Sequence, residues 1–149
     1  MAIRERVPQL VAQSEFTQWL EIVRLNDGRF HVIRRGAAPM FLRASDAILV
    51  SGPFADLLRE RCASSADFMP AAVVQIATGE SWPGYFECMP YYEITPKEWR
   101  NHNIAGDRLW HWGSTSLLAS PDLIDKIEAH AWSMSLRFLP EPDVWYTGE

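Results

Sequence analysis

Cysteine is scarce in this chain. Cys62 and Cys88 are the only two in 149 residues, and they do not form a Cys-x-x-Cys pair. Two cysteines are too few for the disulfide framework of a small secreted domain. We therefore expect both thiols to be buried, packed as small apolar side chains.

Long apolar runs are also missing. The N-terminus, MAIRERVPQLVAQ, has early arginines but no apolar core of signal-peptide length. No stretch reaches the roughly 18 consecutive apolar residues that would cross a bilayer. These absences predict a cytoplasmic protein without a membrane partner. Disorder is not expected, because a hydrophobic fraction of 48% and a charged fraction of 22% are those of an ordinary folded domain.

Basic residues are outnumbered by acidic residues over most of the chain. The net charge is −5, yet up to Arg43 there are seven arginines against four acidic residues. From Ala44 onward, seven Lys or Arg face fifteen acidic residues. An acidic surface repels phosphate backbones, so nucleic acid is not expected as a partner. Such a surface attracts basic proteins, although it can also serve solubility alone.

Catalytic and metal-binding motifs are absent as well. None of the four histidines has His-x-x-x-His spacing, no Gly-x-Ser-x-Gly elbow occurs, and GESWPG lacks the Lys-Ser/Thr of a phosphate-binding loop. We interpret GESWPG as a turn and expect no metal, no cofactor and no catalytic residue. The alternative is a small enzyme whose site would combine Glu87, Cys88 and His111.

A repeated pattern organises much of the chain. Residues 49–70, LVSGPFADLLRERCASSADFMP, and residues 118–140, LASPDLIDKIEAHAWSMSLRFLP, join an apolar pair to a Ser, a Pro, an amphipathic stretch and a closing Phe-x-Pro. In each copy the Pro suits the first turn of a helix. The candidate N-cap is Ser51 or Gly52 in the first copy and Ser120 in the second. Each copy therefore predicts a helix, a short turn and a strand.

Helical spacing predicts the buried face of both helices. The stripes are Phe54, Leu57, Leu58 and Cys62 in the first copy, and Leu123, Ile124, Ile127 and Ala131 in the second. FMPAAVVQIA reads as the strand of the first copy. Apolar residues that alternate from Met134 to Phe138 predict the strand of the second copy.

The rest of the chain completes a single-domain α+β fold. TQWLEIVRL and RFHVIRR flank Asn26-Asp27-Gly28, which predicts an N-terminal β-hairpin. Residues 1–15 are expected to form a polar leader that can be flexible. Residues 16–149 are expected to form one α+β domain, with a mostly antiparallel sheet on which the two similar helix-turn-strand units pack.

The segment between the two copies is rich in aromatic residues. Gly and Pro divide it into predicted short strands near 85–89 and 108–112 and a helical turn at Thr95-Pro96. Strand alternation places Trp110 and Trp112 on one face and His111 on the other.

Aromatic side chains dominate many binding hot spots, although any one of these residues could equally belong to the core. Trp82, in an expected loop, and the Tyr91-Tyr92 pair are the best candidates for exposure, and acidic neighbours would surround them. The candidate partner-binding residues are Trp82, Glu87, Tyr91, Tyr92, Glu93, Asp107, Trp110 and Trp112.

The stretch ILVSGPFADLLRERC…ADFMPAAV, followed later by SPDLIDKIEAH…LRFLP, resembles bacterial immunity proteins that are encoded beside polymorphic toxins, the group catalogued as immunity family eleven. The resemblance covers about residues 46–140 and rests on structural motifs. It implies a small α+β fold and protection of a cell by direct binding of a toxin. Gly52-Pro53 replaces the commoner acidic residue after Ser51, and the paired Cys-x-x-Cys-Gly motifs of some relatives are absent, so no metal is implied.

The function expected from the sequence is therefore that of a non-enzymatic immunity protein. Its partner would be a cognate toxin encoded nearby, whose active site it would occlude. Two alternatives stay open: the small enzyme described above, and a small-ligand or peptide-binding module that uses the aromatic segment 82–112, with Trp110 and Trp112 as a platform.

Overall fold

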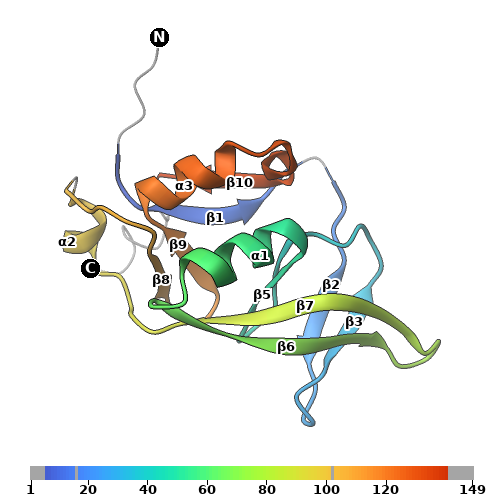
Figure 1. Ribbon diagram of the computed structural model, residues 1–149. Coiled ribbons are helices and arrows are strands. Elements are labelled where there is room, and N and C mark those ends of the chain that lie inside the picture. Colours follow the sequence, from blue (N-terminus) through green and yellow to red (C-terminus); the bar gives the residue numbers. More distant parts are fainter. Residues whose placement is uncertain (1–5, 16, 102, 141–149) are drawn as a thin grey trace.

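The computed structural model describes residues 6–15, 17–101 and 103–140 (Figure 1). The strands are β1(Gln9–Gln13), β2(Glu21–Arg24), β3(Phe30–Arg34), β4(Phe41–Arg43), β5(Ile48–Ser51), β6(Ala66–Gln75), β7(Glu80–Pro90), β8(Leu109–Trp112), β9(Ser116–Ala119) and β10(Leu136–Leu139). The helices are α1(Gly52–Arg61), α2(Pro96–Trp99) and α3(Pro121–Glu128), with a 3-10 helix at Ala131–Ser135. No helix in these described ranges is long and apolar enough to cross a membrane.

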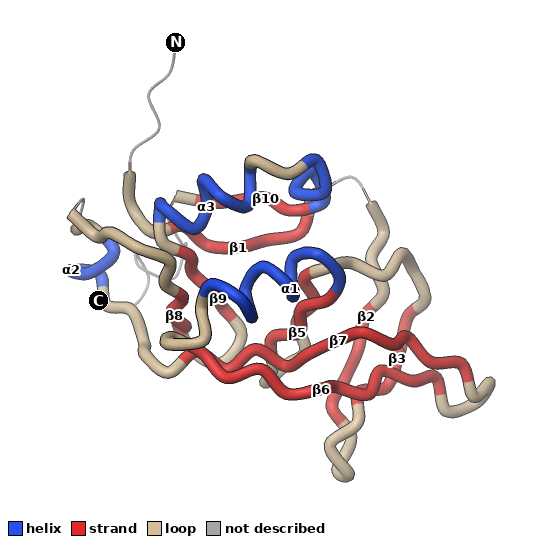
Figure 2. Tube along the Cα trace, in the orientation of Figure 1, coloured by secondary structure: helices blue, strands red, loops and turns tan. Residues whose placement is uncertain are grey.

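The strands form two sheets, as Figure 2 shows. One has the order β10-β1-β9-β8 and the other the order β2-β3-β6-β7-β5-β4. Every neighbouring pair of strands is antiparallel except β3 and β6, which are parallel. The α+β class and the mostly antiparallel pairing are confirmed. The expectation of a single sheet is corrected, because the two repeated units lie in different sheets.

Each repeated unit is a split β-α-β motif. β5 and β6 both pair antiparallel with β7, which lies between them, so they are parallel to each other and are joined by α1. β9 and β10 both pair antiparallel with β1 in the same way, and are joined by α3 and the 3-10 helix. The sequence repeat thus encodes one connection used twice: a helix that carries the chain over an intervening strand.

The two helices contribute to one core. Phe54 and Leu58 of α1 and Leu123 and Ile127 of α3 are fully buried in the same apolar cluster. Removing a side chain of this size from water stabilises the fold by about 1.5–3 kcal/mol. Since neither sheet could bury both stripes alone, this shared cluster holds the two units together.

The N-terminal hairpin is confirmed as β2 and β3, with the turn at Asn26-Asp27-Gly28. Gly28 has a φ of 90°, which glycine adopts without strain, and the Asp27 carboxylate accepts the Arg29 N–H at 3.0 Å. The hairpin forms one end of the larger sheet, and its buried side chains cluster with Leu49 of β5 in a second core. The chain leaves it through Gly36, where a Cβ atom would lie 2.6 Å from the Gln18 carbonyl oxygen.

The polar leader expected over residues 1–15 is wrong for Gln9–Gln13, which form strand β1 between β10 and β9. Residues 1–5 lie outside the described residues. A strand needs a buried residue only at alternate positions, and its backbone bonds come from its neighbours. Val7 and Val11 are the buried apolar residues here. Two apolar residues among polar neighbours are too few to indicate a strand in the sequence.

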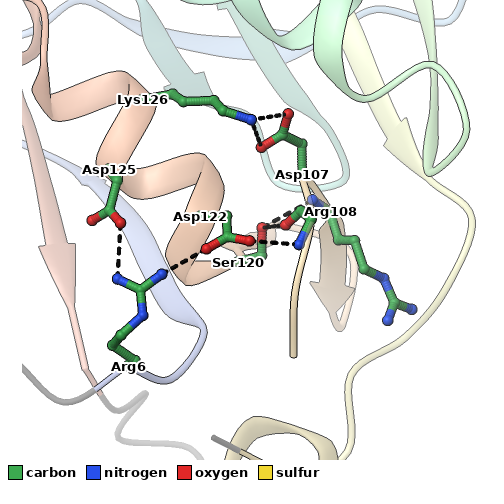
Figure 3. Close-up of polar contacts among 8 residues, drawn as sticks. Arg6, Asp107, Arg108, Ser120, Asp122, Asp125 and Lys126 are labelled. Atoms are coloured by element: carbon green, nitrogen blue, oxygen red, sulfur yellow. Dashed lines mark hydrogen bonds and ion pairs between the residues drawn. The ribbon is translucent and has the colours of Figure 1, made fainter. Parts of the chain in front are cut away.

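Both predicted N-cap serines stand at the N-cap position, but neither side chain caps its helix. The Ser51 hydroxyl donates to the Pro39 carbonyl at 3.2 Å. The Ser120 hydroxyl donates to the Gly106 carbonyl at 2.7 Å and accepts the Arg108 N–H at 2.9 Å (Figure 3). Each hydroxyl therefore ties the start of a helix to a neighbouring segment.

The second unit departs from its predicted pattern after α3. Ala131 is exposed and Met134 is 84% exposed, because the 3-10 helix delays the strand until Leu136. Trp132 takes the inward position instead, with its ring centroid 6.2 Å from that of Phe54. A large aromatic ring on this short helix thus replaces the small side chain that helical spacing had placed in the core.

Candidate partner-binding surface

The eight predicted contact residues do not form one surface. Trp110 is fully buried with Ile94, Trp99 and Leu118, and Trp112 packs against the same cluster. Alternation along β8 did place the two tryptophans on one face, as predicted, but that face is covered. The prediction that Trp110 is a contact residue is therefore wrong, and a ligand platform of Trp110 and Trp112 is not exposed.

Trp82 is not in a loop. GESWPG lies almost wholly in β7, where Trp82 pairs with Val73, and the turn comes earlier, at Gly79 with a φ of 75°. An irregularity in the ladder next to Trp82 accommodates Pro83, which cannot donate a backbone hydrogen bond. The indole is partly buried against the second core, and the Arg35 guanidinium lies 5.9 Å from its ring centroid. Trp82 is thus a packing residue at the far end of the β6–β7 hairpin.

Asp107 is bound to another element of the chain. Its two carboxylate oxygens accept the Lys126 ammonium at 2.7 and 2.6 Å, which joins the segment before β8 to α3 (Figure 3). This ion pair is internal to the chain, so Asp107 has little negative charge to offer a partner.

The acidic residues at the start of α3 are also neutralised. The Arg6 guanidinium donates to Asp122 at 2.6 Å and to Asp125 at 2.8 Å, and Asp122 accepts the Gly106 N–H at 2.6 Å (Figure 3). The hydrogen bond with Asp125 is the main cause that raises the pKa of Arg6. The network fastens the chain before β1 to the second unit and is structural in character.

Tyr91 and Tyr92 are the predicted aromatic residues that the fold leaves exposed, with 48% and 58% of their surface accessible. Their ring centroids are 6.2 Å apart and the rings are nearly perpendicular, at 86°. The Tyr91 hydroxyl donates to Asp67 at 2.6 Å. This bond favours the protonated phenol and raises the pKa of Tyr91.

Further residues extend this region. Met69 is 58% exposed and follows Asp67 by two positions along β6, so both side chains lie on the same face of the sheet. Glu93 is exposed directly after the tyrosine pair. We refer to Asp67, Met69, Tyr91, Tyr92 and Glu93 as the tyrosine surface.

Among the described residues, the negative charge of the tyrosine surface has no cationic partner. Neither Asp67 nor Glu93 forms an ion pair within the described part of the chain, whereas Glu87 is bound to Arg24 at 2.7 Å. Glu87 faces the same side of the sheet as Asp67, because β7 pairs it with Met69. Glu87 therefore borders the tyrosine surface, but its charge is neutralised by Arg24.

The residues of the alternative enzyme do line one hollow, of about 220 Å³. Their chemistry is unfavourable: Cys88 is 2% exposed, and burial raises the pKa of its thiol, so the nucleophilic thiolate is disfavoured. Glu87 is held by Arg24, and His111 Nδ1 is 2.8 Å from the Gly113 carbonyl oxygen. No hydrogen bond joins Cys88 to His111 in the structure as described.

Cys62 is buried like Cys88, as the sequence predicted, and burial raises its pKa to about 12. Within the ranges that the structure describes, no group of three or more His, Cys, Asp or Glu side chains could hold a metal ion.

Sequence reasoning did not single out Asp67 or Met69. They follow the turn after α1 in a run of apolar and small residues, and the sequence shows only that the run is a strand. Whether a strand face is covered depends on where the β2–β3 hairpin stops, which no local pattern records.

No protein-family model, curated protein or solved structure with which the chain was compared matches it. The resemblance to immunity family eleven thus rests on the two sequence motifs.

Proposed function

We propose that this protein is a cytoplasmic immunity protein that binds a cognate toxin directly and occludes the toxin's active site. The observation that carries the proposal is the tyrosine surface, where two exposed tyrosines adjoin two carboxylates without a cationic partner among the described residues. Two free thiols in the core agree with a reducing compartment.

The composition of this surface suits the task. Tyrosine offers a large, rigid ring with a polar hydroxyl, which is the character of many binding hot spots. Carboxylates that are not already paired attract a basic active-site cleft and accelerate encounter. A tight inhibitor complex buries about 1,200–2,000 Å² in total, so the tyrosine surface would form its centre and not its whole extent.

The direct test is co-expression with the product of the neighbouring gene. We expect that product to arrest growth, this protein to restore growth, and the two purified proteins to form a 1:1 complex. If the neighbouring product is not toxic, or if growth stays arrested although this protein is soluble and abundant, the proposal fails.

Substitutions locate the interaction. The double variant Tyr91→Ala and Tyr92→Ala is expected to weaken the complex by about 30-fold or more while the protein stays folded. Ile76→Ala is the matched control, because Ile76 is a similarly exposed apolar residue, 56% accessible, just beyond the other end of β6. The control should bind within about threefold of the unaltered protein.

A second candidate, the small enzyme, is favoured only by the hollow shared by Glu87, Cys88 and His111. The triple variant Glu87→Gln, Cys88→Ala and His111→Ala separates the two functions. An immunity protein that works by occlusion retains growth rescue in this variant, whereas an enzyme that detoxifies through these residues loses it.

A further inference from the structure

The strand that carries part of the tyrosine surface has an unpaired edge. β6 pairs with β7 along most of its length, but its other side pairs with β3 only at Val73 and Val74. Residues 66–72 therefore have no second neighbour strand among the described residues. Figure 1 shows this part of β6 at the outside of the sheet. An open edge of this kind can accept a strand from another chain.

The ladder register shows which residues face the open edge. The Tyr91 N–H donates to the Ser65 carbonyl at 2.9 Å, so these two residues form a hydrogen-bonded pair at the end of the β6–β7 ladder. Hydrogen-bonded and non-hydrogen-bonded pairs alternate in antiparallel strands. Ala66, Phe68 and Pro70 consequently turn their backbone groups away from β7, and Pro70 loses no ladder bond by lacking an N–H.

Few of these outward groups are already used. The Ala66 N–H donates to the Cys62 carbonyl at 3.1 Å. No other partner exists in the described structure for the Phe68 N–H or for the carbonyls of Ala66, Phe68 and Pro70. The edge thus presents one backbone N–H and three backbone carbonyls. A guest strand would mainly donate its own N–H groups to these carbonyls.

Side chains on the two faces of β6 determine which guest strand the edge would favour. Asp67 and Met69 point to the face of the tyrosine surface, where no described residue forms an ion pair with Asp67. Phe68 points to the opposite face, against the main core, and the Arg59 guanidinium lies 4.1 Å from the Phe86 ring centroid on that face. Basic side chains of a guest would therefore favour the Asp67 face, with their alkyl stems beside Met69.

We propose that the edge formed by residues 66–70 binds an extended basic segment of the partner as an additional β-strand. Alternate Lys or Arg residues of this segment face Asp67 and Met69, and the aliphatic residues between them lie beside Phe68 and Pro70. The identification of the segment's owner as the toxin rests on the proposed function, whereas the recognition chemistry of the edge does not.

The probe is a capped heptapeptide, Lys-Val-Lys-Val-Lys-Val-Lys, with Glu-for-Lys as its charge-reversed counterpart. By NMR titration the lysine peptide should bind at least about tenfold more tightly than the glutamate peptide. It should also slow hydrogen exchange of the Phe68 amide by about tenfold or more, while the Met69 amide, already directed at β7, is protected with or without peptide. Equal binding of the two peptides, or unchanged exchange at Phe68, overturns the proposal.

Matched variants test the side-chain part. Asp67→Asn and Met69→Lys should each lower the affinity for the lysine peptide by about threefold or more. The first variant removes a negative charge, and the second adds a positive charge that repels the peptide. Asp56→Asn on α1 and Met134→Lys on the 3-10 helix are exposed controls with the same chemistry, and neither should change binding. Equal losses in the controls would show a nonspecific charge effect and would contradict an edge site.

Failure of this inference and failure of the proposed function can be told apart. If the neighbouring gene product forms a complex and growth is rescued, but the Phe68 amide exchanges as fast in the complex as in the free protein, the edge proposal is wrong and the immunity function stands. If the lysine peptide protects Phe68 but the neighbouring product is harmless, the edge proposal stands and the immunity function falls.

Discussion

The two split β-α-β units share a sequence pattern, a topology and a core, yet they differ in what they leave to solvent. In the second unit, Asp122 and Asp125 are bound by Arg6, and Lys126 binds Asp107. In the first unit, Asp56 and Glu60 of α1 and Asp67 of β6 have no ion pair within the described residues.

The difference separates scaffold from function. The shared features, a helix begun by proline and an apolar stripe, are those that a hydrophobic core requires. The features that differ are acidic side chains without an ion pair among the described residues and the exposed tyrosines, neither of which a core needs. A repeat can thus preserve the fold in both units while one of them carries the surface for binding.

The largest expected effect tests the shared core. Leu58→Ala in α1 and Ile127→Ala in α3 should each lower the free energy of unfolding by about 2–5 kcal/mol, because each leaves a cavity in the same cluster. Urea unfolding followed by circular dichroism and by tryptophan fluorescence should give one coincident transition for both variants. Two separate transitions would mean that the units have independent cores. Ile33→Ala, at a residue 56% exposed, is the control and should change stability by less than about 0.5 kcal/mol.

The next effect concerns the C-caps, where the first unit has Cys62 and the second has Ala129. Burial raises the pKa of Cys62 from 9.0 to about 12. Above pH 9 the unfolded thiol loses its proton while the folded thiol keeps it, so the unfolded state is favoured and stability falls between about pH 9 and 12.

Cys62→Ala should make that decline shallower, as measured by urea unfolding at a series of pH values. Tyr85, whose pKa burial raises to about 12, contributes to the same decline, so the informative quantity is the difference between variant and unaltered protein. Ala129→Cys places a thiol at the exposed C-cap of α3 and should leave the slope unchanged. An identical slope in Cys62→Ala would contradict the prediction.

A smaller effect is expected from the charges of the second unit. Asp107→Asn breaks the ion pair with Lys126 and should cost about 1 kcal/mol, because the Lys126 side chain is 41% exposed and water can solvate its ammonium once the carboxylate is gone. The loss should shrink in 1 M salt, where charges are screened. Partner binding should not change, because Asp107 is already paired with Lys126 and is not part of the tyrosine surface. A loss of binding in Asp107→Asn would show that the contrast between the two units is incorrect.

The smallest effect is confined to the first unit. Asp67→Asn replaces the carboxylate that accepts the hydrogen bond of the Tyr91 hydroxyl. The pKa of Tyr91 should therefore fall toward its ordinary value. NMR titration that resolves individual tyrosine rings measures the shift, and Tyr92 serves as the internal reference. If Tyr91 titrates identically in both proteins, the hydrogen bond to Asp67 is absent in solution.

Elements with strong local signals were predictable. The β2–β3 hairpin follows from Asn26-Asp27-Gly28, and α2 follows from Thr95-Pro96, where the Thr95 hydroxyl accepts the Glu98 N–H. The starts of α1 and α3 follow from Pro53 and Pro121. In each case a residue and its immediate neighbours restrict the backbone, so the sequence alone is sufficient.

The candidate site was predictable only in part. Tyr91, Tyr92 and Glu93 lie together, as proposed, because they are adjacent in the chain. Trp110 and Trp82 were misplaced because the period of a strand says which residues share a face but not what covers that face. Asp67 was missed because its link to Tyr91 depends on the ladder between β6 and β7.

Read alone, the chain specified where helices begin, where turns fall and which residues share a stripe, since steric limits and hydrogen bonding within a few residues govern those features. Three features depend on how distant segments pack. They are the placement of the two units in separate sheets, the ion pairs of Arg6 with Asp122 and Asp125, and the open edge of β6. Those contacts join residues far apart in sequence, and their free energy depends on what each surface meets once the core has formed.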